Sequence, residues 1–303
     1  MVIEVSVPAT TANLGCGFDV LGMALDLHYR IRVVTGEGGG FSITHRGEGE
    51  GMVPLSEEHL LFRTIQRTWQ RIHFLPVALQ VEAWNEIPIA RGLGSSAACI
   101  VAGVAVANWV AGNVLSLEAM MQLAVEIEGH PDNVLPAFLG GFTVAFPQKE
   151  RVYFRRFAFF RDAEIVLCIP RYRLSTERMR KLLPEAYPRH QVVFNLSHLA
   201  YLLGSLFQHD FEGFLLALED YLHEPYRGKE IRGFFAVKEY IKDKGLGNAA
   251  ISGSGPTVIL FLRRPLLAKE TEDLRSIFHA QGAGEVETKR IRWTEQGMVV
   301  KVL

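Results

Sequence analysis

Residues 88–106 read PIARGLGSSAACIVAGVAV and join a glycine-rich turn to an uncharged helix. Gly92 and Gly94 interrupt regular structure, and the hydroxyl of Ser95 or Ser96 is expected to cap the helix that follows. A helix that is apolar on every side is normally buried. Its open end presents unpaired N–H groups and the positive end of the helix dipole, an arrangement that binds phosphate. The alternative is a tight turn that leads into a core helix.

The turn follows neither of two common phosphate-binding patterns. A Walker A loop ends in Lys followed by Ser or Thr, and this chain has no lysine before Lys149. A dinucleotide-binding fingerprint has three glycines directly after a strand. Phosphate charge must therefore be neutralised by backbone amides, by a metal ion or by Arg91.

The turn resembles the ATP-binding signature of the GHMP small-molecule kinases, a family that includes galactokinases, homoserine kinases, mevalonate kinases and phosphomevalonate kinases. The shared pattern is Pro-x-x-x-Gly-Leu-Gly-Ser-Ser-Ala-Ala. The resemblance implies that ATP binds to this stretch, which consists of Pro88, Ile89, Ala90, Arg91, Gly92, Leu93, Gly94, Ser95, Ser96, Ala97 and Ala98.

The composition is that of an ordinary globular protein. The 303 residues are 49% hydrophobic and 21% charged, which allows a sizeable core and favours two domains. We expect these to be residues 1–150 and residues 151–303. A net charge of -1 gives no reason to expect a nucleic acid or an anionic membrane as a partner.

Three features favour a cytoplasmic location. Cys16, Cys99 and Cys168 are odd in number and far apart, unlike a disulfide framework or a metal site. The first residues, MVIEV, lack the basic segment and apolar core of a signal peptide. The longest uncharged apolar run, residues 97–106, is too short to span a bilayer. We therefore expect a cytoplasmic protein with no membrane partner.

A second glycine-rich loop, residues 8–25, reads PATTANLGCGFDVLGMAL. Alone, it indicates a strand connection in which Asn13 and Asp19 form turns. Beside the first motif, it resembles the N-terminal signature of the homoserine kinases, and it lacks the lysine that mevalonate kinases carry near their start. The resemblance implies that both side chains face an amino-acid substrate. Asn13 would orient its hydroxyl and Asp19 would bind its ammonium group.

An acidic helix end supplies candidate metal ligands. Residues 117–128 predict a helix that ends in two glutamates. Mg²⁺ prefers hard oxygen ligands and usually takes one or two carboxylates together with phosphates and water. In the family that the motifs resemble, an acidic residue of this helix and a serine of the ATP motif hold the metal. We expect Glu126 and Ser95 to do so here. Glu128 and Ser96 are the alternatives, and the structural interpretation of Glu128, an exposed helix-end charge, is favoured over metal binding.

The turn after this helix, HPDN at residues 130–133, matches the His-x-Asp-Asn pattern of the homoserine kinases. The resemblance implies that Asp132 and Asn133 border the substrate, and we expect Asp132 to help bind the ammonium group. Their structural alternative is to cap the turn that follows. His130 is interpreted as structural because nothing nearby in the sequence suggests a partner for a catalytic base.

Two arginine motifs lie in the C-terminal half. Residues 175–180, STERMR, resemble the Ser-Thr-x-x-x-Arg of the homoserine kinases. By resemblance, Thr176 lies near the reacting hydroxyl and Arg180 binds the substrate carboxylate; alone, Arg180 is an ordinary surface charge. Residues 224–227, EPYR, offer Arg227 as a second partner, and two guanidinium groups suit one carboxylate because each donates two N–H groups.

A third glycine-rich turn, GNAAISGSGPT at residues 247–257, precedes an apolar strand. It matches the family motif that approaches the phosphate-transfer site from the second domain. The resemblance implies that Gly253 borders the substrate.

Strand and helix patterns alternate in the C-terminal half and predict an α+β fold. By resemblance, residues 1–150 have the N-terminal GHMP kinase fold, like domain 2 of ribosomal protein S5, and residues 151–303 a ferredoxin-like fold. We expect residues 152–160 and 163–169 to form paired strands, and residues 285–302 to form a terminal hairpin. Further helices are expected at residues 57–74, 174–184, 234–244 and 266–281, and strands at residues 2–7, 25–34, 77–84 and 258–262.

The motifs together imply ATP-dependent phosphorylation of the side-chain hydroxyl of L-homoserine, giving O-phospho-L-homoserine for threonine biosynthesis. Asp132 and His130 are candidates for a general base, but neither is a strong one, and Asp132 is better used on the ammonium group. We therefore expect alignment and charge neutralisation to carry most of the rate, with Asn13 and Thr176 positioning the hydroxyl. The alternatives are another GHMP kinase, acting on shikimate or mevalonate, or a non-catalytic nucleotide-binding module. The resemblance also makes a homodimer an expectation.

Overall fold

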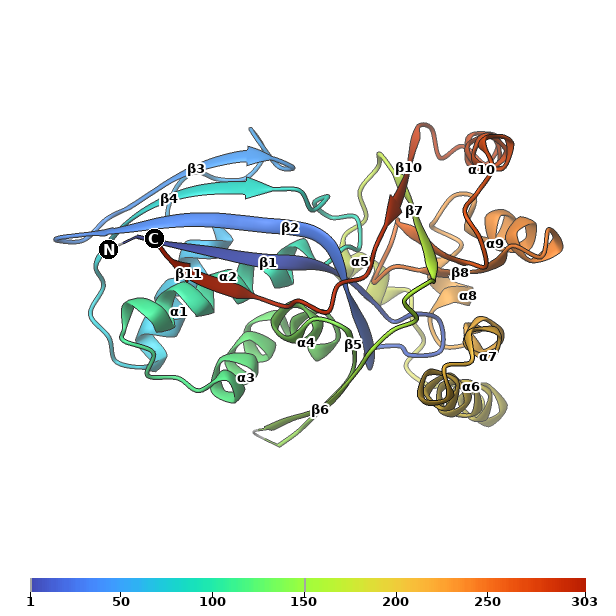
Figure 1. Cartoon of the computed structure of the whole chain (residues 1–303), viewed down its shortest axis with the longest axis horizontal. Helices are drawn as coiled ribbons and strands as arrows, with labels where there is room; N and C mark the ends of the chain where they lie inside the picture. The colour runs from blue at the N-terminus through green and yellow to red at the C-terminus, as the bar shows by residue number, and fades with distance from the viewer. Residues whose placement is uncertain (1, 150) are drawn as a thin grey trace.

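The computed structural model describes residues 2–149 and 151–303 and has two halves, each built on its own sheet (Figure 1). The first sheet, on the left of Figure 1, lies beside both chain ends, and the second sheet lies on the right. The α+β class expected from the sequence is confirmed. None of the described helices combines the length and the apolar character that crossing a membrane requires.

The first sheet has seven strands within the described residues, in the order β11-β1-β2-β4-β3, with β5 paired to β2 and β6 paired to β5. Its neighbours are antiparallel except for β3 and β4. Along β4, buried and exposed residues alternate, as expected for a sheet with one covered face. The strands are β1 (Val2–Ala12), β2 (Leu21–Gly36), β3 (Phe41–Gly47), β4 (Ala78–Asn85), β5 (Phe142–Gln148), β6 (Arg151–Phe157) and β11 (Val299–Val302).

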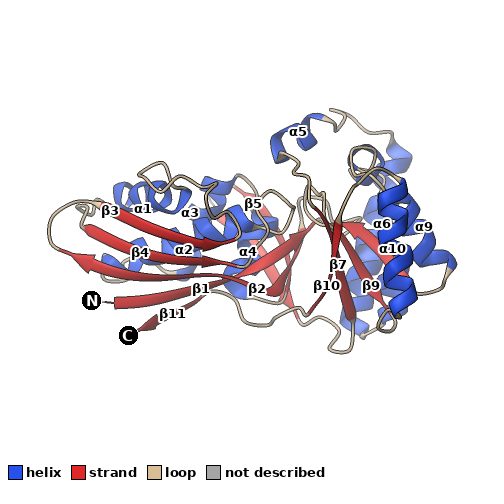
Figure 2. Ribbon diagram, turned by 90° about the horizontal axis from the view of Figure 1, so that it is seen from above, coloured by secondary structure: helices blue, strands red, loops and turns tan. Residues whose placement is uncertain are grey.

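Helices α1 to α4 lie over one face of the first sheet (Figure 2). The uncharged helix expected after the glycine-rich turn is α2 (Ser95–Val110), and residues 97–108 of it are all buried, which confirms the prediction. It packs between α1 and β1. The other helices of this half are α1 (Leu60–Arg71), α3 (Leu117–Glu128) and α4 (Pro131–Leu139).

The second sheet has four antiparallel strands among the described residues, in the order β10-β7-β9-β8. Numbered along the chain within this sheet, the order is 4-1-3-2, and the elements follow one another as βαββαβ, which is the ferredoxin-like arrangement. Both faces are covered, because successive residues of β7 point alternately into two separate cores. The strands are β7 (Glu164–Pro170), β8 (Gly247–Ile251), β9 (Val258–Leu262) and β10 (Val286–Ile291).

Six helices belong to the second half of the described chain. Residues of α9 and α10 pack into one core of the sheet, and residues of α6 and α7 contribute to the other. Helix α6 is long and was not expected from the sequence. The helices are α5 (Thr176–Lys181), α6 (Arg189–Gln208), α7 (Phe211–Ala217), α8 (Glu224–Arg227), α9 (Phe234–Asp243) and α10 (Ala268–Ala280).

Two strand pairings expected from the sequence are wrong. β6 and β7 do not pair with each other, because β6 forms an exposed hairpin with β5 whereas β7 is buried between β9 and β10. The last two strands do not form a hairpin either, because β10 pairs with β7 and β11 pairs with β1 of the first sheet. The chain end therefore returns to the first half, and β11 ties the two halves together.

The division into residues 1–150 and 151–303 stays a prediction, and residue 150 lies outside the described residues. Sheet membership crosses this point, since β6 and β11 both follow it and both belong to the first sheet.

Candidate active site

A cavity of about 590 Å³ contains nearly all of the residues that the motifs single out. Its size is typical of a small-molecule site. Glu126, Ala97 and Ala98 do not line it, whereas Glu128 does. The predicted site residues that line it are Asn13, Asp19, Asp132, Asn133, Thr176, Arg180, Arg227, Gly253 and residues 88–96.

The mouth of α2 opens into this cavity. The N-cap is Gly94, with a φ of 69° and no side-chain cap, so the expected capping by a serine hydroxyl is wrong. A Cβ on Gly94 would lie 1.9 Å from Oγ1 of Thr10, which leaves glycine as the residue that fits. The first bond of the helix runs from the N–H of Ala98 to Gly94, so the N–H groups of Ser95 and Ser96 have no intrahelical partner.

The glycine-rich turn before α2 is held by the two other glycine-rich motifs. The N–H of Thr10 donates to the carbonyl of Leu93 at 3.2 Å. From the other half, the hydroxyl of Ser252 donates to the carbonyl of Gly92 at 2.7 Å. The three motifs therefore form one hydrogen-bonded unit, which fixes the helix mouth relative to the second sheet.

Glu128, at the end of α3, faces the start of α2. The hydroxyl of Ser96 donates to its carboxylate at 2.9 Å. Glu126 instead is exposed and accepts a hydrogen bond from the amide of Gln122. Burial raises the pKa of Glu128 above its usual value and outweighs the opposite effects of His130 and Ser96. The structure thus brings the alternative pair, Glu128 and Ser96, to the mouth of α2, and it does not bring Glu126 there.

The HPDN turn forms a hydrogen-bonded chain beside the mouth of α2. His130 Nδ1 lies 2.6 Å from Oδ1 of Asp132, and the amide of Asn133 donates to the same oxygen at 3.3 Å. Asn133 accepts in turn from the hydroxyl of Thr10 at 2.8 Å. Burial opposes a charge on His130, but Asp132 and Glu128 outweigh it and raise the pKa of His130. His130 thus has the acidic partner that the sequence did not reveal.

Asn13 lies where the two halves meet. Its amide donates to the carbonyl of Gly253 at 2.6 Å, and its side-chain oxygen accepts from the N–H of Asp19 at 3.0 Å. The hydroxyl of Thr176 lies 3.1 Å from that of Ser254, on the same glycine-rich turn as Gly253. The two side chains predicted to position the reacting hydroxyl therefore both contact the third motif.

Arg180 and Asp19 form a two-hydrogen-bond ion pair at 2.8 and 2.9 Å. Arg180, which was predicted to bind the substrate carboxylate, is thus paired with Asp19, which was predicted to bind the substrate ammonium group. Arg227 lies against the ring of Phe18, 2% exposed, and forms no ion pair with a carboxylate among the described residues. One of its N–H groups donates to the carbonyl of Gly253 at 3.3 Å, and its Nε has no partner. Burial lowers the pKa of Arg227.

Comparison with known proteins assigns the family. Two family models match, "GHMP kinases N terminal domain" over residues 59–141 and "GHMP kinases C terminal" over residues 202–280. The chain is 43% identical over 262 residues to homoserine kinase from Synechococcus sp. (strain CC9902), which covers 85% of this chain and 82% of that protein. It is 38% identical over 259 residues to homoserine kinase from Carboxydothermus hydrogenoformans, covering 86% and 84% respectively. The chain belongs to the GHMP kinase family.

Solved structures agree with this assignment. This GHMP kinase superposes on the crystal structure of homoserine kinase from Cytophaga hutchinsonii with a TM-score of 0.84 and 26% identity, over 99% of this chain and 97% of that one. A crystal structure of mevalonate kinase superposes with a TM-score of 0.66 and 14% identity, over 97% of this chain and 99% of that one, and it shows the shared fold alone. The fold expected from the motifs is confirmed.

The cavity of this GHMP kinase has an end that the sequence did not indicate. Tyr29, His45, Val53, Pro54 and His59 line it, and they come from strands, a loop and a helix cap that carry no recognised motif. Burial and His45 lower the pKa of His59 to about 4, so its ring is neutral near pH 7. A single sequence gives no signal for these residues, because isolated histidines and apolar residues at such positions are typical of any core.

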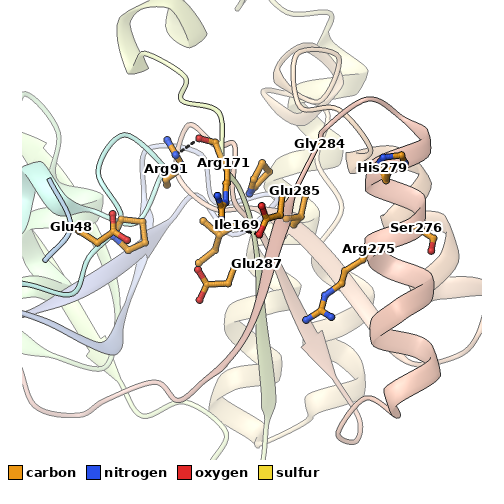
Figure 3. Close-up of a pocket in the computed structure, with 13 residues that line it drawn as sticks. Glu48, Arg91, Ile169, Arg171, Arg275, Ser276, His279, Gly284, Glu285 and Glu287 are labelled. Carbon is orange, nitrogen blue, oxygen red and sulfur yellow. Dashed lines mark hydrogen bonds and ion pairs between the residues drawn. The ribbon is translucent and has the colours of Figure 1, made fainter. Parts of the chain in front are cut away.

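A wider hollow of about 1190 Å³ lies outside this cavity (Figure 3). It runs between the glycine-rich turn and the β10–α10 side of the second half. Arg91 lines both hollows and donates a hydrogen bond to the carbonyl of Arg171. Arg171 in turn forms an ion pair with Glu285 at 2.8 Å. Nη2 of Arg91 and the Arg171 guanidinium are thus used within the protein, whereas Nη1 of Arg91 is buried without a hydrogen-bond partner.

Proposed function

We propose that this GHMP kinase transfers the γ-phosphoryl group of ATP to the side-chain hydroxyl of L-homoserine, giving O-phospho-L-homoserine for threonine biosynthesis. The observation that carries the proposal is one cavity in which the open mouth of α2 faces a buried guanidinium without a carboxylate partner, that of Arg227. The named relatives that cover most of the chain are homoserine kinases, which supports the same substrate.

ATP would bind with its phosphates at the mouth of α2. The free N–H groups of Ser95 and Ser96 and the dipole of a buried helix favour a phosphate there. Charge on the phosphates cannot be neutralised by a P-loop lysine, since the motif has none. The adenosine would extend toward the apolar end of the cavity, between Val53, Pro54 and the neutral ring of His59.

Mg²⁺ fits this site through Glu128 and the hydroxyl of Ser96, with Ser95 as the alternative hydroxyl. A half-buried carboxylate with a raised pKa is poorly solvated, and a bound cation would relieve that cost. One carboxylate with phosphate oxygens and water is a usual set of ligands for Mg²⁺. When bound, the ion would neutralise charge that develops on the transferred phosphoryl group. Glu126, which we expected to bind the metal, does not line the cavity and contacts Gln122 instead.

Homoserine would bind between Asp19, Asp132 and the two arginines. Its carboxylate fits Arg180 together with Arg227, because two guanidinium groups satisfy a carboxylate through paired hydrogen bonds. Its ammonium group fits Asp19 and Asp132, with Asn133 beside them. The carbonyl of Gly253, which already accepts from Asn13 and Arg227, borders the same space.

The reacting hydroxyl would be positioned by Asn13 and Thr176, which both contact the third motif. Phosphoryl transfer through a loose transition state needs little early removal of the proton. Alignment of the hydroxyl with the phosphate and neutralisation of charge would then supply most of the rate. We propose no dedicated base, and Asp132 acts on the ammonium group.

The test is ADP release with homoserine, serine, mevalonate and shikimate as acceptors. We expect turnover with homoserine and little with the others, because mevalonate and shikimate lack the ammonium group and serine has a shorter side chain. Preference for mevalonate or shikimate would identify another GHMP kinase. Nucleotide binding without turnover on any acceptor would indicate a non-catalytic module.

We also propose that the protein is a cytoplasmic homodimer. The location is supported by Cys16, Cys99 and Cys168, which are buried and unpaired, as suits a reducing compartment.

A further inference from the structure

Helix α6 lies at the outer edge of the second half (Figure 1) and carries an uncovered apolar face. Leu202 and Leu206 point into the core. On the opposite side Val193, Leu196 and Phe207 are 55%, 60% and 80% exposed. Exposed apolar surface on one element, rather than scattered single residues, marks an interaction site.

The exposed residues follow the spacing of a helix–helix seam. Val193, Leu196, Ala200 and Phe207 succeed one another at intervals of three, four and seven residues, as do the contact positions of two packed helices. Gly204 lies on the same side, since a Cβ built on it would meet nothing within 4 Å. The residues of this face are therefore small at its middle, at Ala200 and Gly204, and their side chains are larger toward both ends.

The composition of α6 indicates a protein partner. Residues 190–209 contain no Asp, Glu, Lys or Arg, in a chain that is 21% charged. A helix that lies on a membrane surface carries Lys and Arg along its polar face, and α6 has none after Arg189. A helix face exposed to water normally carries charge instead.

The face is complementary to itself when one copy is reversed. Val193 lies seven residues before Ala200 and Phe207 seven residues after it, so an antiparallel pair that crosses at Ala200 sets the ring of Phe207 against the smaller side chain of Val193, and Leu196 against Gly204. Arg189, which has no ion-pair partner among the described residues, would approach Asp210 of the second copy. A parallel pair would instead set Arg189 against Arg189, which repels.

We propose that α6 is the contact surface of a homodimer, in which two α6 helices cross antiparallel on a twofold axis at Ala200. The two copies then use the same residues, as a twofold interface requires. This specifies the interface of the homodimer proposed above and does not depend on which substrate the enzyme phosphorylates.

The direct test is disulfide trapping with Ala200→Cys. Two cysteines on the axis of a close helix crossing can reach the short Cα separation of a disulfide. The native cysteines are buried, so the unmodified protein is a suitable background. Under mild oxidation we expect a covalent dimer as the main species for Ala200→Cys. Neither Phe207→Cys, which would face Val193, nor Lys269→Cys, exposed on α10, should give one. Cross-linking of Phe207→Cys would contradict the antiparallel arrangement, and a lack of cross-linking at Ala200→Cys would overturn the proposal.

A second test measures the mass in solution. Light scattering should give twice 33.9 kDa for the unmodified protein and 33.9 kDa for Leu196→Glu. Leu267→Glu is the matched control, since the two leucines are 60% and 61% exposed, and it should stay dimeric. A monomeric unmodified protein, or a Leu196→Glu variant that stays dimeric, would overturn the proposal. Circular dichroism of each variant separates loss of the dimer from loss of the fold, and the trapping result holds even if Leu196→Glu unfolds.

Discussion

Arg180 on α5 binds Asp19 of the β1–β2 loop through two hydrogen bonds, of 2.8 and 2.9 Å, across the cavity between the two halves of the molecule. The pair holds the cation and the anion that we propose for the two charged ends of homoserine. Binding of the substrate would therefore replace the ion pair between Arg180 and Asp19 with two ion pairs to the substrate. Arg180 would pair with the substrate carboxylate, and Asp19 with the substrate ammonium group. Selectivity for a zwitterion follows, because an acceptor with one charge leaves one partner unpaired.

Arg180→Ala should raise the KM for homoserine about 10–100-fold, since hydrogen bonds to a charged group contribute about 1.5–3 kcal/mol. The KM for ATP should stay near its original value. Arg178→Ala is the control, because Arg178 lies on the same helix and pairs with Glu230 outside the cavity. Steady-state kinetics with each substrate varied in turn give the comparison. Equal changes in both KM values would refute a role for Arg180 at the carboxylate.

Arg227→Met should separate binding from stability. Burial of a guanidinium without a carboxylate partner costs free energy, so replacement by an apolar side chain of similar length should leave the free energy of unfolding nearly unchanged or raise it. The variant should nevertheless lose most of its affinity for homoserine. Thermal unfolding with and without homoserine measures both effects, because a ligand that binds only the folded protein raises its stability. A variant that is strongly destabilised but still gains stability from homoserine would show that Arg227 is structural.

Glu128→Gln should lower kcat by at least about 100-fold, as expected when an electrostatic group that acts in the transition state is removed. Glu126→Gln is the matched control on the same helix end and should keep normal turnover, because Glu126 contacts Gln122 outside the cavity. Turnover should be measured over a range of Mg²⁺ concentrations. If Glu126→Gln were the defective variant, the assignment of the metal to Glu128 would be wrong.

His59→Asn should reduce the sensitivity of the fold to acid. The pKa of His59 is about 4 in the folded protein, below the ordinary histidine value of 6.5, so between these two pH values the unfolded chain binds a proton that the folded chain does not. Stability due to this group is therefore present above pH 6.5 and is lost as the pH falls toward 4. Asparagine keeps an acceptor for the N–H of Leu61, as His59 provides at the cap of α1. Chemical unfolding at several pH values gives the slope of the free energy of unfolding against pH, and His73→Asn, at an exposed position, is the control. An unchanged slope for His59→Asn would contradict this explanation.

Much of this site could be predicted from local sequence. The turn before α2 needs glycine at a left-handed position and an apolar helix after it, and both features are visible in residues 88–106. The sequence did not decide between Glu126 and Glu128. Residues two positions apart on a helix point in directions about 200° apart, so these two side chains cannot both face α2. Which of the two faces α2 depends on how α3 packs, and the apolar residues of α3 do not define one narrow face.

Contacts between distant segments could not be predicted from the sequence. The pairing of Asp19 with Arg180 spans 161 residues, and nothing local distinguishes a substrate-binding charge from a paired one. The partners of β7 and β11 were missed for the same reason, since alternation shows that a strand exists and not where it pairs. Helix α6 was missed because its exposed face is apolar, which removes the amphipathic period that marks a surface helix.

The measurement that tests the central claim most directly is identification of the phosphorylated product in one mixture of homoserine, serine, mevalonate and shikimate with ATP and Mg²⁺. Mass spectrometry and ³¹P NMR report which acceptor gains the phosphoryl group. We predict O-phospho-L-homoserine as the main product, formed in step with ADP and formed at least about 100-fold more slowly when Glu128→Gln replaces the unmodified enzyme. A main product formed from another acceptor, or ADP release without any phosphorylated acceptor, would contradict the account.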